Sequence, residues 1–137
     1  MEAVQSREQA AVSVSWEAAR HKKYRFPVIY ATEMFEISRI HPLKQKVAID
    51  VAKFVRESSE IEKAIVFGGA TTIRCHSGSD LDVALKLKDG ADTAAARDRI
   101  SEGIQLITEW NADVIWLNDE EPGTQLYNNI EEGVLIK

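Results

Sequence analysis

The most regular alternation of apolar and polar residues lies in the first half of the chain, just after Pro42. Apolar side chains recur there every three or four positions, at Leu43, Val47, Val51, Phe54 and Val55. This spacing puts them on one face of a helix, and proline is favoured in a first helical turn. The pattern therefore predicts an amphipathic helix over 43–57, which ends at Ser58 and Ser59.

Shorter apolar runs predict strands. Four consecutive apolar residues within 63–67 are typical of a strand buried on both faces. Further strands are expected over 79–87, 112–117 and 133–137. Helices are expected over about 92–109, capped by Asp92 or Thr93, and over 124–131. Two more helices are predicted over 5–20 and 28–40.

The order of these elements indicates an α/β (α+β) fold, in which a small mixed sheet is backed by helices. A chain of 137 residues suits one domain with a sizeable core. We expect a helical N-terminal extension over 1–42 and a single domain over 43–137.

Composition narrows the class of protein. The net charge of −5 argues against a protein that mainly binds nucleic acid without specificity. Cys75 is the only cysteine, which excludes an intramolecular disulfide and fits a reducing compartment. The N-terminus does not resemble a signal peptide, and no apolar stretch approaches the roughly 20 residues of a membrane helix. We therefore expect a soluble, cytoplasmic protein.

Three acidic residues stand inside apolar strand patterns. Asp80 and Asp82 alternate with Leu81 and Val83, so both carboxylates are expected on one face of the strand over 79–87. Asp113 stands in the apolar run over 112–117. Such carboxylates can hold a divalent cation for phosphoryl or nucleotidyl transfer. The alternative is an edge strand whose acidic face is simply solvated.

A glycine pair precedes the acidic strand. Gly68 and Gly69 follow the strand over 63–67, where they let the backbone turn sharply and approach a ligand closely. If a helical turn begins there, its N–H groups form a site for the phosphates of a nucleotide. A glycine pair alone is only a turn signal; the acidic strand beyond it gives it a functional interpretation.

Together these residues resemble the nucleotidyltransferase superfamily typified by DNA polymerase beta. Phe67-Gly68-Gly69, ten further residues and then Asp80-Leu81-Asp82-Val83 match the superfamily's signature. Within it, residues 43–137 most resemble the minimal nucleotidyltransferases (MNT), small domains often paired with a HEPN-domain partner. In that group a third acid occupies a later strand, as Asp113 does.

The resemblance implies a role for each residue. Asp80 and Asp82 would hold Mg²⁺ or Mn²⁺, and Asp113 would complete the metal site and activate the attacking hydroxyl. Gly68 and Gly69 would lie against the triphosphate of a nucleotide, with ATP the expected substrate. Ser79, or alternatively Thr71 or Ser77, would add a hydroxyl contact to a phosphate, and Arg74 would be either a further phosphate contact or a solvated loop residue. The implied reaction transfers AMP to an acceptor hydroxyl, for instance a tyrosine of a HEPN toxin, which would make this chain an antitoxin.

One departure from the family pattern leaves an alternative open. Many members have serine at the second glycine position, whereas Gly69 offers only its N–H, and Arg74 is the only arginine or lysine in the spacer before Asp80. The alternative is a non-catalytic module that keeps the fold and neutralises a partner by contact. A homodimer is the other expected assembly. Neither a membrane nor a nucleic acid is expected as a partner.

Overall fold

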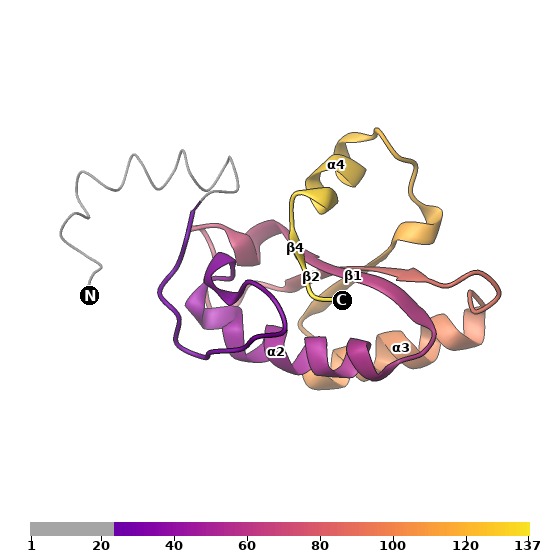
Figure 1. Cartoon of the computed structure of the whole chain (residues 1–137), viewed down its shortest axis with the longest axis horizontal. Helices are drawn as coiled ribbons and strands as arrows, with labels where there is room; N and C mark the ends of the chain where they lie inside the picture. Colours follow the sequence, from indigo (N-terminus) through magenta and orange to yellow (C-terminus); the bar gives the residue numbers. More distant parts are fainter. Residues whose placement is uncertain (1–23) are drawn as a thin grey trace.

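The computed structural model describes residues 24–137 (Figure 1). Its helices are α2 (Pro42–Glu57), α3 (Ala94–Ile107) and α4 (Gln125–Glu131). Single 3₁₀ turns are η1 (Ile37–Arg39), η2 (Gly68–Thr71) and η3 (Leu117–Asp119). The strands are β1 (Ile61–Phe67), β2 (Leu81–Leu87), β3 (Ala112–Trp116) and β4 (Val134–Leu135). The predicted α/β class is confirmed.

The strands form one mixed sheet in the order β3-β2-β1-β4. β1 is antiparallel to β2 and to β4, whereas β2 and β3 are parallel. The parallel pair is joined through α3, because parallel neighbours need a crossover connection. As a result the beginnings of β2 and β3 and the end of β1 lie at the same end of the sheet.

Helices cover both faces of this sheet (Figure 1). α2 and α3 pack on one face, where the larger core forms around residues such as Val51, Val83 and Ile104, all fully buried. α4 lies on the other face, over a smaller cluster that includes Ile65, Ala84 and Ile130. None of the helices within residues 24–137 is long and apolar enough to cross a membrane.

The helix starts have identifiable caps. The side chains of His41, Thr93 and Thr124 accept hydrogen bonds from the backbone N–H groups of Leu43, Ala96 and Tyr127 at the starts of α2, α3 and α4. Capping of this kind satisfies N–H groups that have no partner inside the helix. It explains why the predicted starts of these three helices agree with the structure to within two residues.

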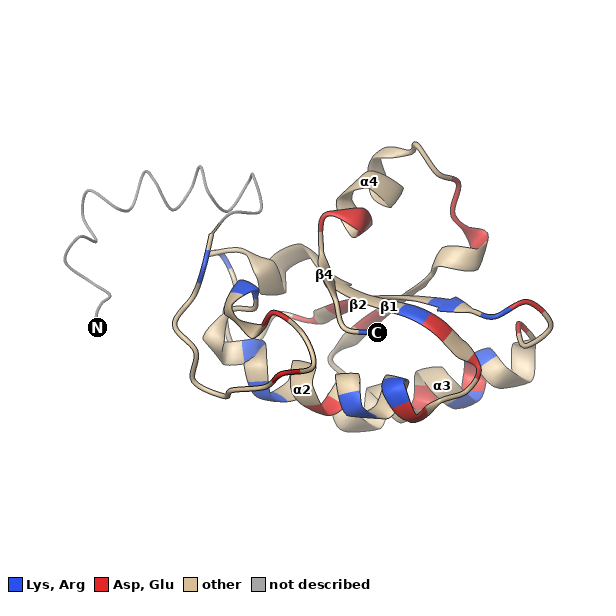
Figure 2. Cartoon of the chain, viewed as in Figure 1, with Lys and Arg blue, Asp and Glu red and all other residues tan. Residues whose placement is uncertain are grey.

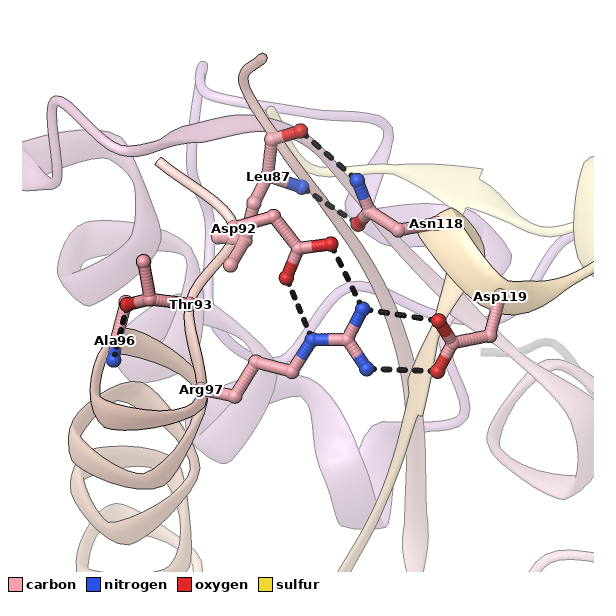
Figure 3. Close-up of polar contacts among 7 residues, drawn as sticks. All are labelled: Leu87, Asp92, Thr93, Ala96, Arg97, Asn118 and Asp119. Atoms are coloured by element: carbon pink, nitrogen blue, oxygen red, sulfur yellow. Dashed lines mark hydrogen bonds and ion pairs between the residues drawn. The ribbon is translucent and has the colours of Figure 1, made fainter. Parts of the chain in front are cut away.

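A polar network closes the end of the sheet opposite the beginnings of β2 and β3 (Figure 3). Arg97 on α3 pairs with Asp92 (2.7 Å) and with Asp119 of η3 (2.6 Å). The Asn118 side chain bonds both the N–H and the carbonyl of Leu87 at the end of β2. These contacts tie η3 to α3 and β2.

The helix predicted over 28–40 is wrong. The chain there is irregular apart from η1, and the start of the segment bonds to α2. The fully buried Gln45 side chain accepts from the N–H groups of Ile29 (2.8 Å) and Tyr30 (3.1 Å) and donates to the Pro27 carbonyl (2.9 Å). The helix predicted over 5–20 lies outside the described residues.

The predicted strand 79–87 begins two residues too early. β2 starts at Leu81, whose N–H donates to the Asn111 carbonyl, so Asp80 lies in the preceding loop. β1 ends at Phe67, which pairs with Asp82, and therefore offers no partner for Asp80. Only Asp82 of this acidic pair is a strand residue.

Candidate active site

Asp82 lies where three strands meet. In the sheet it pairs with Phe67 at the end of β1 and with Asp113 near the start of β3. Residues paired across neighbouring strands share a face of the sheet. Asp82 and Asp113 are therefore on the α4 face, next to the cluster that contains Phe67 and Ala84. Two acids from distant parts of the sequence are thus brought side by side.

The absence of a side chain at Gly68 leaves room for the Asp82 carboxylate. A Cβ atom built on Gly68 would lie 2.2 Å from Oδ2 of Asp82, which is closer than real Cβ contacts allow. Gly68 also has φ +71°, in the region where side chains are disfavoured. The backbone N–H of Gly69 favours the charged form of the same carboxylate. The turn that begins η2 and the acid of β2 therefore form one unit.

The pKa of Asp82 is raised above its ordinary value. Burial is the largest cause, followed by repulsion from Asp113 and, more weakly, from Asp80, while the Gly69 N–H opposes the shift. Asp80 and Asp113 are both exposed. Asp80 therefore acts on Asp82 although it is outside the strand, and the other two acids predicted from the sequence both act on Asp82 at one end of the sheet.

The loop between η2 and β2 carries the remaining predicted residues. The hydroxyls of Thr71 and Thr72 donate to the carbonyls of Gly68 and Gly69 and hold the turn. Ser79, just before Asp80, accepts from the His76 N–H. Arg74 is exposed in this loop. Around Gly69 there is open space, with no atom within 4 Å of a Cβ atom built there.

The donor set suits a hard divalent cation. Carboxylate oxygens are the ligands that Mg²⁺ prefers, and negative charge is concentrated around Asp82. Within residues 24–137, no three Cys, His, Asp or Glu side chains already converge into a metal cage. This is expected of acids that repel one another. Asp80, Asp82 and Asp113 are the acids that could hold a metal here.

One charged residue near this loop has no signal in the sequence. Lys44 looks like a solvated helix lysine, yet its side chain is buried beneath the loop, and its Nζ donates to the Ser77 carbonyl. Its position depends on how α2 meets the loop, where the His41 N–H donates to the Ala70 carbonyl. Helical periodicity alone could not have found it.

Comparison with known protein families shows which family this chain belongs to. The family model described as Polymerase beta, Nucleotidyltransferase matches residues 50–137, more than half of the chain. The chain therefore belongs to the polymerase beta nucleotidyltransferase family, and this membership indicates nucleotidyl transfer. The match includes the glycine pair and all three acids. A search of curated protein sequences found no significant match.

Proposed function

We propose that this protein is a metal-dependent nucleotidyltransferase that transfers AMP from ATP to an acceptor hydroxyl. The observation that carries the proposal is the unit formed by Gly68, Gly69 and Asp82, with Asp113 beside it. It joins a turn open to a ligand at Gly69 to a carboxylate crowded by other negative charge. A triphosphate with its metal ions matches both parts of this unit, because the phosphates suit the open turn and the metal ions suit the carboxylate.

The residues would divide the chemistry between them. The acceptor oxygen bonds to the α-phosphorus, the bond from that phosphorus to the bridging oxygen breaks, and pyrophosphate leaves. Asp113 takes the hydroxyl proton. Gly68 and Gly69 hold the phosphates, aided by Ser79 and Arg74. Asp80 and Asp82, together with Asp113, would hold Mg²⁺ or Mn²⁺, which supplies charge neutralisation when bound.

The proposed acceptor is a tyrosine of a HEPN-domain toxin, which would make this chain an antitoxin. This step depends on the resemblance to minimal nucleotidyltransferases and on family analogy. Acidic and basic residues interleave along α2 and α3 (Figure 2), and this mixture favours a protein or small-molecule partner over nucleic acid. A homodimer is the second proposed assembly.

Labelled ATP tests the proposal directly. With Mg²⁺ and a cognate HEPN partner, the parent should leave labelled AMP on the partner and release pyrophosphate. Asp82→Asn should abolish transfer, whereas Asp98→Asn, at an exposed acid on α3, should not. Transfer that survives Asp82→Asn would contradict the proposed site.

Gly69 favours a second candidate, a binding module without catalysis. It has no hydroxyl with which to contact a phosphate, and Arg74 is the sole arginine or lysine of the spacer. Such a module would bind and neutralise its partner without ATP. Calorimetry separates the two candidates: if the parent binds the partner but neither binds ATP nor transfers AMP, the enzyme proposal fails and the module remains.

A further inference from the structure

A cavity lies on the opposite face of the sheet from Asp82. It measures about 310 Å³ and lies between α2, the end of α3 and the loop before β2. We call it the Lys44 cavity, after the residue that lines it together with Ser77, Leu81, Thr108 and Asn111. Neither the glycine pair nor any of the three site acids lines it. Its volume falls at the small end of the range for small-molecule sites.

Lys44 is unusual among the charged residues that line this cavity. It is only 8% exposed, and its Nζ makes a single long hydrogen bond, 3.4 Å, to the Ser77 carbonyl. In the part of the chain that the structure describes, no carboxylate pairs with it. Two carboxylates also line the cavity: Asp50 pairs with Lys46 at 3.0 Å, and Glu109 is exposed to solvent just after the end of α3. A buried ammonium without a counter-charge is costly.

The positive charge of Lys44 contributes to the pKa shifts of two neighbouring side chains. The pKa of His41 is lowered, first by burial and then by Lys44. The pKa of Cys75 is raised by burial, with Lys44 acting in the opposite direction. In both groups the Lys44 contribution is second to burial, and it indicates that the ammonium lies near His41 and Cys75.

Further hydrogen-bond donors line the same cavity. Within residues 24–137, neither the Asn111 amide group nor the Ser77 hydroxyl has a side-chain hydrogen bond to another protein group. We propose that the Lys44 cavity binds an oxyanion, a phosphate or carboxylate group of a small molecule, with Lys44 as its counter-charge and Asn111 and Ser77 as donors. A charge-assisted bond of this kind would compensate the buried ammonium. The proposal does not rest on the proposed transfer activity.

An NMR titration of the full ¹⁵N-labelled chain tests it, without nucleotide or divalent metal. Inorganic phosphate and acetate are added separately, against sodium chloride at equal ionic strength. We expect saturable shifts of the Ser77, Thr108 and Asn111 amides with at least one of the two. The anion whose shifts saturate at the lower concentration is the one that the cavity binds more tightly. No saturable shift with either, or shifts confined to Gly68 and Gly69, would overturn the proposal.

Variants separate this role from a structural one. Lys44→Met should weaken anion binding by at least about tenfold, whereas Lys53→Met, at an exposed lysine of α2 that does not line the cavity, should preserve it. If Lys44→Met is folded and still binds like the parent, the proposal is wrong.

A second variant, which is expected to be more stable than the parent, tests the proposal if Lys44→Met does not fold. Asn111→Asp places a carboxylate in the cavity, so it should raise the Tm of the anion-free protein and weaken the phosphate response. If Lys44 had only a structural role, Asn111→Asp would not be expected to reduce the response to phosphate. An unchanged response would contradict the proposal.

Discussion

At the scale of single residues, the two adjacent glycines beside Asp82 have opposite requirements. Gly68 has a positive φ and no room for a Cβ atom, whereas Gly69 faces open space. Gly68→Ala should therefore destabilise the protein by at least about 1–3 kcal/mol, the scale of a strained backbone. It should also displace the Asp82 carboxylate and weaken ATP binding.

Gly69→Ser is the matched control, because a side chain there meets no atom within 4 Å. It should change stability by no more than about 0.5 kcal/mol. Since it restores the hydroxyl common in the family, it should bind ATP as well as the parent or better. Urea denaturation and calorimetry measure both effects. Equal stability of the Gly68→Ala and Gly69→Ser variants would show that Asp82 does not approach Gly68 as described.

The raised pKa of Asp82 makes stability depend on pH. The folded protein holds this proton more tightly than the unfolded chain does. Stability is therefore lost as the pH rises from the ordinary Asp value of 3.8 through the raised value, and the loss persists above it. Below 3.8 the acid is protonated in both states and the penalty vanishes.

Asp82→Asn should consequently be more stable than the parent at pH 7. The expected gain is on the order of 0.5 kcal/mol, because solvent screens a half-exposed carboxylate. The gain should shrink to nothing as the pH falls below 3.8. Thermal unfolding of parent and variant from pH 3 to 8 measures it, with Asp98→Asn as the control. A parent that is more stable than Asp82→Asn at pH 7 would contradict the electrostatic account.

At the scale of elements, Gln45 joins the segment before α2 to the helix itself. Its side chain bonds four backbone groups, those of Pro27, Ile29, Tyr30 and Ile40. Gln45→Leu keeps the volume similar and leaves these groups without their partner. It should cost about 1–3 kcal/mol and speed amide exchange at Ile29 and Tyr30. Gln125→Leu, at an exposed glutamine of α4, should be nearly neutral. Unchanged exchange in Gln45→Leu would exclude this anchoring role.

Elements whose signals are local could be predicted from the sequence. α2 is an example, because Pro42 and the apolar spacing after it act within one helix. The segment 28–40 could not be predicted in this way, because its conformation depends on Gln45, a partner that lies beyond it in the chain. The sequence does not locate the start of β2 for a related reason, since that start depends on where β1 ends.

The candidate site, too, could be predicted from the sequence only as far as its signals are local. The glycine pair and the three acids could be recognised from residue types and spacing. That Asp113 pairs with Asp82 depends on the strand order β3-β2-β1-β4, which no local pattern encodes. The close approach of Gly68 to Asp82 and the burial of Lys44 likewise come from packing between distant segments.

At the scale of the whole molecule, the candidate site is assembled from separate elements, so binding and chemistry should be separable. The glycine pair belongs to η2 and Asp82 to β2, whereas Asp113 comes from β3, the last strand on its side of the described sheet. Asp113 is exposed, so Asp113→Asn should leave the fold intact. It keeps the shape of the side chain but removes the charge that would accept the proton.

We therefore expect Asp113→Asn to bind ATP nearly as tightly as the parent and to lose AMP transfer by roughly 10²–10⁴-fold, the contribution typical of a general base. Asp82→Asn should impair both binding and transfer, because Asp82 belongs to the unit that would hold the triphosphate. Since the acids act together, the losses of the two variants should not add in the double variant. Calorimetry with ATP and the labelled transfer assay measure the two steps on the same samples. If Asp113→Asn retains the parent's transfer rate, Asp113 is not the proton acceptor, and the proton must pass to another group near Asp82.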